Sequence, residues 1–222
     1  MRWNSRELGA ISPALFIPLL EETGLMAQVG QWAIETACVQ HKLWLDAGLG
    51  PIRIAVKISA RQLREADFAE MIARVLTRYG LTADALEIEV TEDMLMADVN
   101  CTQAAILALH RMGLRVAVDD FGTGYSSLSF LKQFPIHTIK IDGSFISEVP
   151  KNESDVEIIK AIIRMGQSLS RRVSAEGVEN AVQLEALRQL GCHEIQGYVL
   201  IPPLPGVQLF DVFRNEYLFA SA

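Results

Sequence analysis

Two adjacent carboxylates stand at the start of a glycine-rich loop, and they are the strongest chemical signal in the sequence. The string Asp119-Asp120-Phe121-Gly122-Thr123-Gly124 follows an apolar run. At the end of a strand the alternation of sides breaks down, so both carboxylates could converge on one cation or on two close ones. Such oxygen ligands suit Mg²⁺ or Mn²⁺ better than zinc. A turn in which an aspartate caps a helix is the alternative for an isolated pair.

Further acidic side chains stand at the ends of other β-branched runs. Glu89 and Glu92 bracket the end of one run, and Glu176 and Glu179 follow another. A buried glutamate is costly unless it is paired or bound to a metal. The alternative is that Glu87 and Glu89 face solvent on an edge strand.

Lys140 lies inside an apolar run, with Ile139 and Ile141 expected on the opposite face. An inward ammonium group would balance the carboxylates and could orient water. A lysine that extends to the surface is the alternative for a single Lys. An acidic cluster with one lysine at successive strand ends is typical of a hydrolase that uses a divalent metal.

The elements that must position these groups alternate between strands and helices. The predicted strands are the β-branched runs 52–58, 86–90, 114–118, 138–141, 172–175 and 194–198. The predicted helices are the segments rich in Ala, Leu, Arg and Glu at 13–22, 28–47, 60–79, 102–112, 154–169 and 180–190. This alternation predicts parallel pairing with crossovers, in either a doubly wound sheet or a barrel. No G-x-G-x-x-G or Walker motif follows a predicted strand, and most strands end in an ionisable or amide side chain such as Gln196, which favours a barrel mouth.

The composition limits the classes of protein that need to be considered. The chain has 222 residues, a formal net charge of −7 and 50% hydrophobic residues, which suits a single domain spanning residues 1–222. The surplus of acid disfavours a nucleic-acid polymer as partner. No run of eighteen apolar residues predicts a membrane segment. Three widely spaced cysteines are typical of reduced thiols, so we expect a cytoplasmic protein.

These motifs, in this order, resemble those of the EAL domain family, the bacterial cyclic di-GMP phosphodiesterases, over essentially the whole chain. The matching segments are Arg2-Trp3-Asn4, residues 12–18 and 21–24, 59–63, Glu89-Val90-Thr91-Glu92, residues 119–127, Lys140-Ile141-Asp142, Ala175-Glu176-Gly177-Val178-Glu179 and Gln196-Gly197-Tyr198. The resemblance implies a TIM-like (β/α)₈ barrel with Mg²⁺ or Mn²⁺ at its mouth. It also implies hydrolysis of cyclic di-GMP to the linear dinucleotide pGpG.

The resemblance further implies roles for individual residues. Glu89, Asp119, Asp120 and Glu176 match the family's metal ligands, and Lys140 matches the lysine that holds the attacking water, so Lys140 and Glu176 are the implied catalytic residues. Glu92 matches the acid that anchors the loop after Asp120, and the family uses this loop region, residues 121–131, for homodimer or partner contacts. Arg2 matches a phosphate contact, while Glu179 and Gln196 match residues that line the substrate site.

The chain departs from the family pattern at three places. Met1 stands where a variable residue would follow the Glu-Ala-Leu tripeptide, so we expect that glutamate ligand and about two strands to be missing. Lys57 replaces the asparagine that ligates metal in active members, and an ammonium group has no lone pair to donate. Ile201-Pro202 replaces the usual Ser-Arg, which removes a polar contact to the ligand.

These departures predict a degenerate domain that binds cyclic di-GMP or a protein partner without competent hydrolysis. The alternative is an active metal-dependent phosphodiesterase. About six predicted strands cannot close a barrel as the family does, because unpaired backbone groups would remain at the sheet edges. We expect the gap to be covered by residues 1–12, by a partner chain or by distortion of the sheet.

Overall fold

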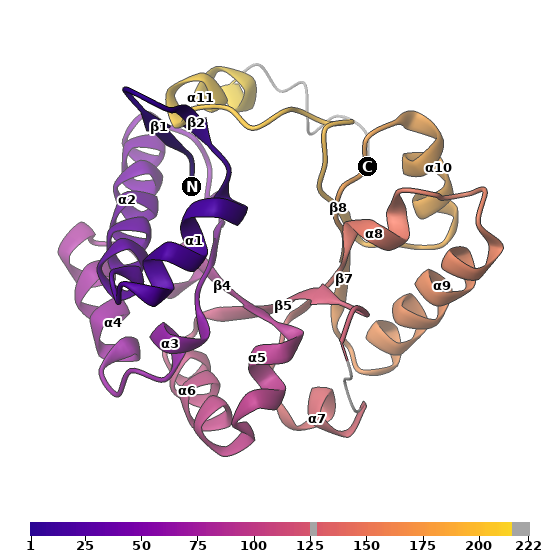
Figure 1. Ribbon diagram of the computed structural model, residues 1–222, viewed down its shortest axis with the longest axis horizontal. Coiled ribbons are helices and arrows are strands. Elements are labelled where there is room, and N and C mark those ends of the chain that lie inside the picture. The colour runs from indigo at the N-terminus through magenta and orange to yellow at the C-terminus, as the bar shows by residue number, and fades with distance from the viewer. Residues whose placement is uncertain (125–127, 215–222) are drawn as a thin grey trace.

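The sheet is the central element of the structure, a computed structural model that describes residues 1–124 and 128–214, the side chains of 128–130 excepted. Six parallel strands in the order β3-β4-β5-β6-β7-β8 curl around a common centre, with the long helices on the outside (Figure 1). The strands are β3 (Ile54–Lys57), β4 (Leu86–Thr91), β5 (Arg115–Phe121), β6 (Thr138–Ile141), β7 (Arg172–Ala175) and β8 (Glu194–Ile195). This curled half-barrel confirms the truncated TIM-like barrel that the sequence predicted.

The helices that cover the sheet follow the predicted segments, with shifts of a few residues at most ends. The predicted helices appear as α1 (Pro13–Glu22), α2 (Met26–Asp46), α3 (Ala60–Leu63) with α4 (Phe68–Tyr79), α6 (Val99–Arg111), α9 (Glu153–Ser168) and α10 (Ala181–Gln189). The prediction of one helix over 60–79 was wrong, because α3 ends at Leu63 and α4 begins only at Phe68, after a break in the helical backbone. The elements that were not predicted are β1 (Trp3–Ser5), β2 (Gly9–Ile11), η1 (Ala83–Ala85), α5 (Glu92–Ala97), α7 (Leu128–Gln133), α8 (Gly143–Ile146) and α11 (Gly206–Arg214).

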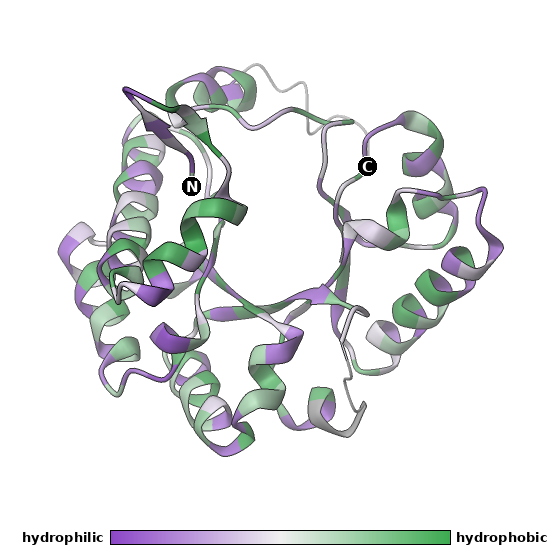
Figure 2. Ribbon diagram, viewed as in Figure 1, coloured by the Kyte–Doolittle hydropathy of each residue, from purple (hydrophilic) through white to green (hydrophobic). Residues whose placement is uncertain are grey.

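The two faces of the sheet carry different chemistry. On the face toward the helices, side chains such as Ile88, Val118, Ile139 and Val173 are fully buried. Burying each of them stabilises the fold by roughly 1.5–3 kcal/mol. The inward positions of the same strands hold polar side chains, and hydrophilic stretches are visible on the strands that surround the centre (Figure 2). The outer face can therefore supply the stability while the inner face holds charged groups.

The curled sheet is open between β3 and β8. Among the described residues β3 pairs with β4 alone, and a groove of about 820 Å³ runs along its other edge, lined by residues of α1, α2, β3 and α11 together with Met1. Residues 3–11 form the hairpin β1–β2, whose strands pair with each other rather than with β3. Helix α1, which is largely apolar (Figure 2), and the hairpin border the opening, whereas cover by a partner chain stays a prediction.

The chain after β8 crosses the opening and reaches α2. The indole Nε1 of Trp44, on α2, donates a hydrogen bond to the carbonyl of Gly206 at 3.2 Å. The ring of Trp44 also meets that of Phe213 edge to face, with 5.7 Å between the centroids. These contacts attach α11 to α2, as Figure 1 shows at the top of the view. None of the described helices is both long enough and apolar enough to span a membrane.

We expect Trp44→Ala to lower the free energy of unfolding by about 3 kcal/mol, because it removes a buried indole together with its hydrogen bond. Urea denaturation measures the effect. Trp32→Ala is the matched control, since Trp32 lies on the same helix with 55% of its surface exposed, and its effect should stay below about 1 kcal/mol. Equal losses in the two variants would show that Trp44 does not anchor α11.

His137 joins two strands at the amino end of the sheet. Its backbone N–H donates to the carbonyl of Val116 at 2.8 Å, and its ring Nδ1 accepts a hydrogen bond from the N–H of Val116 at 3.2 Å. Burial, together with the nearby charge of Arg115, lowers the pKa of His137 from 6.5 to about 4. The folded state therefore favours the neutral ring, whose Nδ1 keeps its lone pair for Val116.

This arrangement predicts that acid destabilises the protein in a defined pH window. Since the folded-state pKa of His137 lies below the unfolded value, its contribution is complete above pH 6.5 and is lost as the pH falls toward about 4. We expect a loss of about 1–2 kcal/mol, allowing for the partial exposure of the ring. Urea titrations at pH 7 and pH 4.5 should show a smaller loss for His137→Asn, which keeps an acceptor but does not titrate. The same loss in both proteins would disprove the role of His137.

Candidate functional site

A distortion of β5 brings Asp119 and Asp120 to the same side. The pairing of β5 with β6 shifts register between Val118 and Phe121, and Asp120 has a φ of +55°, in the left-handed region. Aspartate tolerates this region better than most side chains do. One carboxylate oxygen each from Asp119, Asp120 and Glu176 lies within 4.8 Å of the others. Both aspartates belong to the strand itself, so the alternative of a helix-capping turn is wrong.

Two lysines lie among the carboxylates. The ammonium group of Lys140, on β6, pairs with Glu89 and Glu176 and lies 3.4 Å from Asp119 Oδ1. The Nζ of Lys57, at the end of β3, lies 2.8 Å from an oxygen of Asp119 and 2.8 Å from an oxygen of Asp120. We call these six side chains the mouth cluster: Lys57, Glu89, Asp119, Asp120, Lys140 and Glu176.

Burial decides two of the alternatives that the sequence left open. The residue Lys140 is only 5% exposed, so it does not extend to the surface. Glu87 and Glu89 are each 9% exposed on β4, which lies between β3 and β5 and is not an edge strand. Both alternatives that placed these residues in solvent are therefore wrong.

The pKa shifts in the mouth cluster follow from burial and from the mutual attraction of its charges. Burial opposes the charged form of Lys140, but Glu89, Glu176 and Asp119 together raise its pKa well above the usual value. Burial likewise opposes ionised Asp119, yet Lys140 and Lys57 lower its pKa. The pKa of Glu176 is raised, because burial and the neighbouring acids outweigh the ammonium of Lys140.

The charges of the mouth cluster do not balance. Four carboxylates face two ammonium groups, which leaves a formal excess of two negative charges. The Oδ1 atom of Asp119 is buried and accepts no hydrogen bond from a described residue. The ammonium group of Lys140 lies 3.4 Å from that oxygen, so a hard divalent cation would supply both the missing charge and a closer contact for it. The donor set of Asp119, Asp120 and Glu176 therefore fits one such ion.

The architecture and this cluster match one known family. The model of the EAL domain family matches residues 1–203. The chain belongs to the EAL domain family. It is similar to a bifunctional diguanylate cyclase/cyclic di-GMP phosphodiesterase, MucR of Pseudomonas aeruginosa, with 41% identity over 209 residues, 94% of this chain and 30% of that protein.

Two further relatives support the assignment. The cyclic di-GMP phosphodiesterase NbdA of Pseudomonas aeruginosa is 39% identical over 222 residues, all of this chain and 28% of NbdA. The solved structure of the PaMucR phosphodiesterase in complex with c-di-GMP superposes with a TM-score of 0.91 at 41% identity, over 94% of this chain and 84% of that one. This EAL domain thus spans less than a third of the length of these two curated relatives.

The acid predicted to anchor the loop after β5 lies beside that loop. Glu92 is 2% exposed at the start of α5, and its Oε2 accepts a hydrogen bond from the backbone N–H of Gly122 at 2.8 Å. The contact joins the carboxyl ends of β4 and β5. The predicted homodimer or partner segment, residues 121–131, includes residues 125–127, which lie outside the described residues, so that role stays a prediction.

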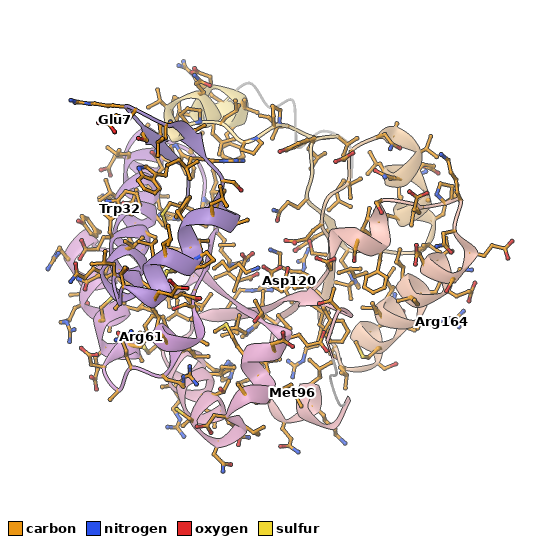
Figure 3. The ribbon with its side chains drawn as sticks, viewed as in Figure 1. Glu7, Trp32, Arg61, Met96, Asp120 and Arg164 are labelled. Carbon is orange, nitrogen blue, oxygen red and sulfur yellow. The ribbon has the colours of Figure 1, made fainter. Side chains whose placement is uncertain are left out.

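Three predicted ligand contacts do not join the mouth cluster. Glu179 and Gln196 follow β7 and β8 at the same end of the sheet, and both are exposed. Arg2 is also exposed, next to Met1 at the groove along β3, and it forms no ion pair within the described part of the chain. Figure 3 shows Asp120 near the centre, where side chains from several strands converge. The roles of these three residues in binding a ligand stay predictions.

A buried amide that was not predicted from the sequence lies behind the site. Gln183 of α10 is 4% exposed, and its side chain contacts the backbone of the loop that follows Glu176. A signal for it was present, since Asn180-x-x-Gln183 fits the pattern of a capping box at a helix start. The pattern predicts a cap, but it does not reveal that the same amide reaches a second loop.

We expect Lys140→Met to destabilise the EAL domain by about 3–5 kcal/mol, because the buried carboxylates lose their counter-ion. Thermal unfolding measures the loss, and added Mn²⁺ should restore part of it by replacing the lost positive charge. The control is Lys42→Met, which breaks an exposed pair with Asp46 and should cost less than about 1 kcal/mol. If Lys140→Met is as stable as the control, the mouth cluster does not depend on this lysine.

Proposed function

We propose that this EAL domain binds cyclic di-GMP at the mouth cluster, together with at most one Mg²⁺ or Mn²⁺ ion, and does not hydrolyse it competently. The supporting observation is the position of Lys57, whose ammonium group bridges Asp119 and Asp120 at 2.8 Å each. A signalling role as a receptor for cyclic di-GMP follows from binding without turnover.

The limit of one metal ion is inferred from the net charge of the mouth cluster. Two metal ions that clamp the entering and leaving oxygens of a phosphodiester need a surplus of carboxylate charge. The ammonium of Lys57 reduces that surplus to two negative charges, which one divalent ion neutralises. At about 4 Å and an effective dielectric constant of about 20, the repulsion between unit charges is about 4 kcal/mol, and a divalent ion doubles it. A second ion would therefore meet both repulsion and a lack of ligands.

The identity of the ligand is inferred from the relatives and from the polar groups around the mouth. NbdA is a cyclic di-GMP phosphodiesterase, and the PaMucR structure contains c-di-GMP. Lys57 is 47% exposed at its side chain, so its ammonium can meet a phosphate that enters the mouth. Arg2, Glu179 and Gln196 are the proposed contacts to the rest of the ligand.

An active phosphodiesterase is the second candidate, and one observation favours it. The oxygens of Asp119, Asp120 and Glu176 already lie close enough to share an ion. Under this alternative, metal would displace Lys57 from the aspartates, and Lys140 and Glu176 would act in catalysis.

Calorimetry with cyclic di-GMP, with and without Mg²⁺, separates the two candidates, with chromatography of the products for pGpG. For the wild-type protein we expect binding in both conditions and no pGpG. Lys57→Asn should strengthen Mn²⁺ binding roughly tenfold or more, because the repulsion disappears and an amide oxygen becomes available. Lys42→Asn is the matched control, since Lys42 lies on α2 with a side chain that is 45% exposed and paired with Asp46, and it should change neither affinity.

Three results would contradict this proposal. Formation of pGpG by the wild-type protein at high Mn²⁺ would establish the active phosphodiesterase instead. No heat with cyclic di-GMP under any condition would reject the receptor. Unchanged Mn²⁺ affinity in Lys57→Asn would reject the limit that we place on the metal.

A further inference from the structure

Three loops at the carboxyl ends of β6, β7 and β8 touch through their backbones. Gly177, with a φ of +68°, lies so close to the neighbouring loop that an added Cβ would stand 3.2 Å from the Cα of Gly143. A Cβ on Gly197 would stand 2.0 Å from the carbonyl oxygen of Val178, which leaves no room for any side chain. These loops directly follow Asp142, Glu176 and Gln196, so their contacts set how one half of the mouth is arranged.

Gln183 connects two of these loops from behind. Its Oε1 accepts hydrogen bonds from the backbone N–H groups of Glu179 at 2.8 Å and Asn180 at 3.3 Å. Its Nε2 donates to the carbonyls of Ile146 at 3.2 Å and Ser147 at 3.3 Å. A side-chain amide has two acceptor sites and two donors, so all four are used in a position that is 4% exposed.

The four bonds join the segments that carry two partners of the mouth cluster. Glu179 and Asn180 end the loop that begins at Glu176, while Ile146 and Ser147 end the turn of α8 that begins three residues after Lys140. Glu176 and Lys140 are ion-paired. Gln183 touches neither side chain, but it fixes the distance between the two backbones that present them.

We propose that Gln183 is a positioning residue that holds the carboxylate of Glu176 against the ammonium of Lys140. Its importance for ligand binding rests on the function proposed above, whereas its effect on the Glu176–Lys140 pair does not. Without the amide, the N–H groups of Glu179 and Asn180 must find water, and the loop after β7 moves away from α8 to admit it. Glu176 then moves with its loop, while Lys140 keeps its pairs with Glu89 and Asp119.

The two lysines of the mouth cluster provide an internal comparison. Lys140 pairs with Glu176 on the side that Gln183 supports, whereas Lys57 pairs with Asp119 and Asp120 on β5. The ¹⁵Nζ resonances of both ammonium groups can be followed by NMR in the same sample, and Lys57→Asn and Lys140→Met assign them. A general loss of stability would affect both signals or neither.

We expect Gln183→Met to shift the Lys140 signal and to speed its exchange with water, while the Lys57 signal stays as in the wild type. Gln183→Glu keeps an acceptor for the N–H groups of Glu179 and Asn180 but loses both donors, so its shift should be smaller. If Gln183→Met does not fold, the same NMR measurement on Gln183→Glu tests the proposal. The control is Gln189→Met, an exposed glutamine on the same helix that bonds only Glu185 among the described residues, and it should leave both signals unchanged.

The outcomes are distinct. An unchanged Lys140 signal in both Gln183 variants, or equal shifts of Lys140 and Lys57, would overturn the proposal. The NMR result needs no ligand, so it stands even if the protein does not bind cyclic di-GMP. If it does bind, Gln183→Met should weaken the affinity for Mn²⁺ roughly tenfold or more, as the loss of a supporting hydrogen bond does at other metal sites.

Discussion

The close packing of two ammonium groups and four carboxylates at the end of one sheet is the constraint on which the rest of the structure depends. Buried charges are costly unless each is paired, and the pairs here come from different strands. Only a fixed register between neighbouring strands keeps Lys140 opposite Glu89 and Glu176. That register is held by the apolar outer face, where residues such as Ile139 and Val173 are fully buried beneath the helices. The apolar core thus stabilises the mouth cluster, whose ion pairs alone would not fix the register of the strands.

The open side of the half-barrel makes the mouth asymmetric. The side chain of Lys140 is 7% exposed, whereas that of Lys57, at the strand beside the opening, is 47% exposed. β3 pairs with β4 alone in the described part of the chain, and its residues are less buried than those of β4 and β6. Lys140 therefore acts as a fixed counter-ion, while Lys57 can exchange its partners with solvent or ligand. The two lysines are alike in charge but differ in what can reach them.

Much of this could be predicted from the sequence, and the failures have physical reasons. The alternation of β-branched runs with helical segments located all six strands of the sheet, because each strand packs apolar side chains against the core, fully buried in β4 to β7 and partly buried in β3 and β8. The acids and Lys140 at the strand ends were found for the same reason. Short elements such as α8, which has four residues, were missed, since a few residues give no periodicity. The left-handed Asp120 and the reach of Gln183 to α8 depend on contacts between distant segments, which no local pattern records.

Under the proposed function, the position of Lys57 also determines how metal and ligand affect each other. Its ammonium group has three N–H donors and uses two of them on Asp119 and Asp120, so the third can meet a phosphate oxygen while both aspartates stay paired. A divalent ion on the same aspartates would be repelled by that ammonium group, and a phosphate paired with Lys57 would lower the repulsion. Metal and ligand would therefore each favour the binding of the other, and the coupling must be reciprocal because it is a property of the binding free energies.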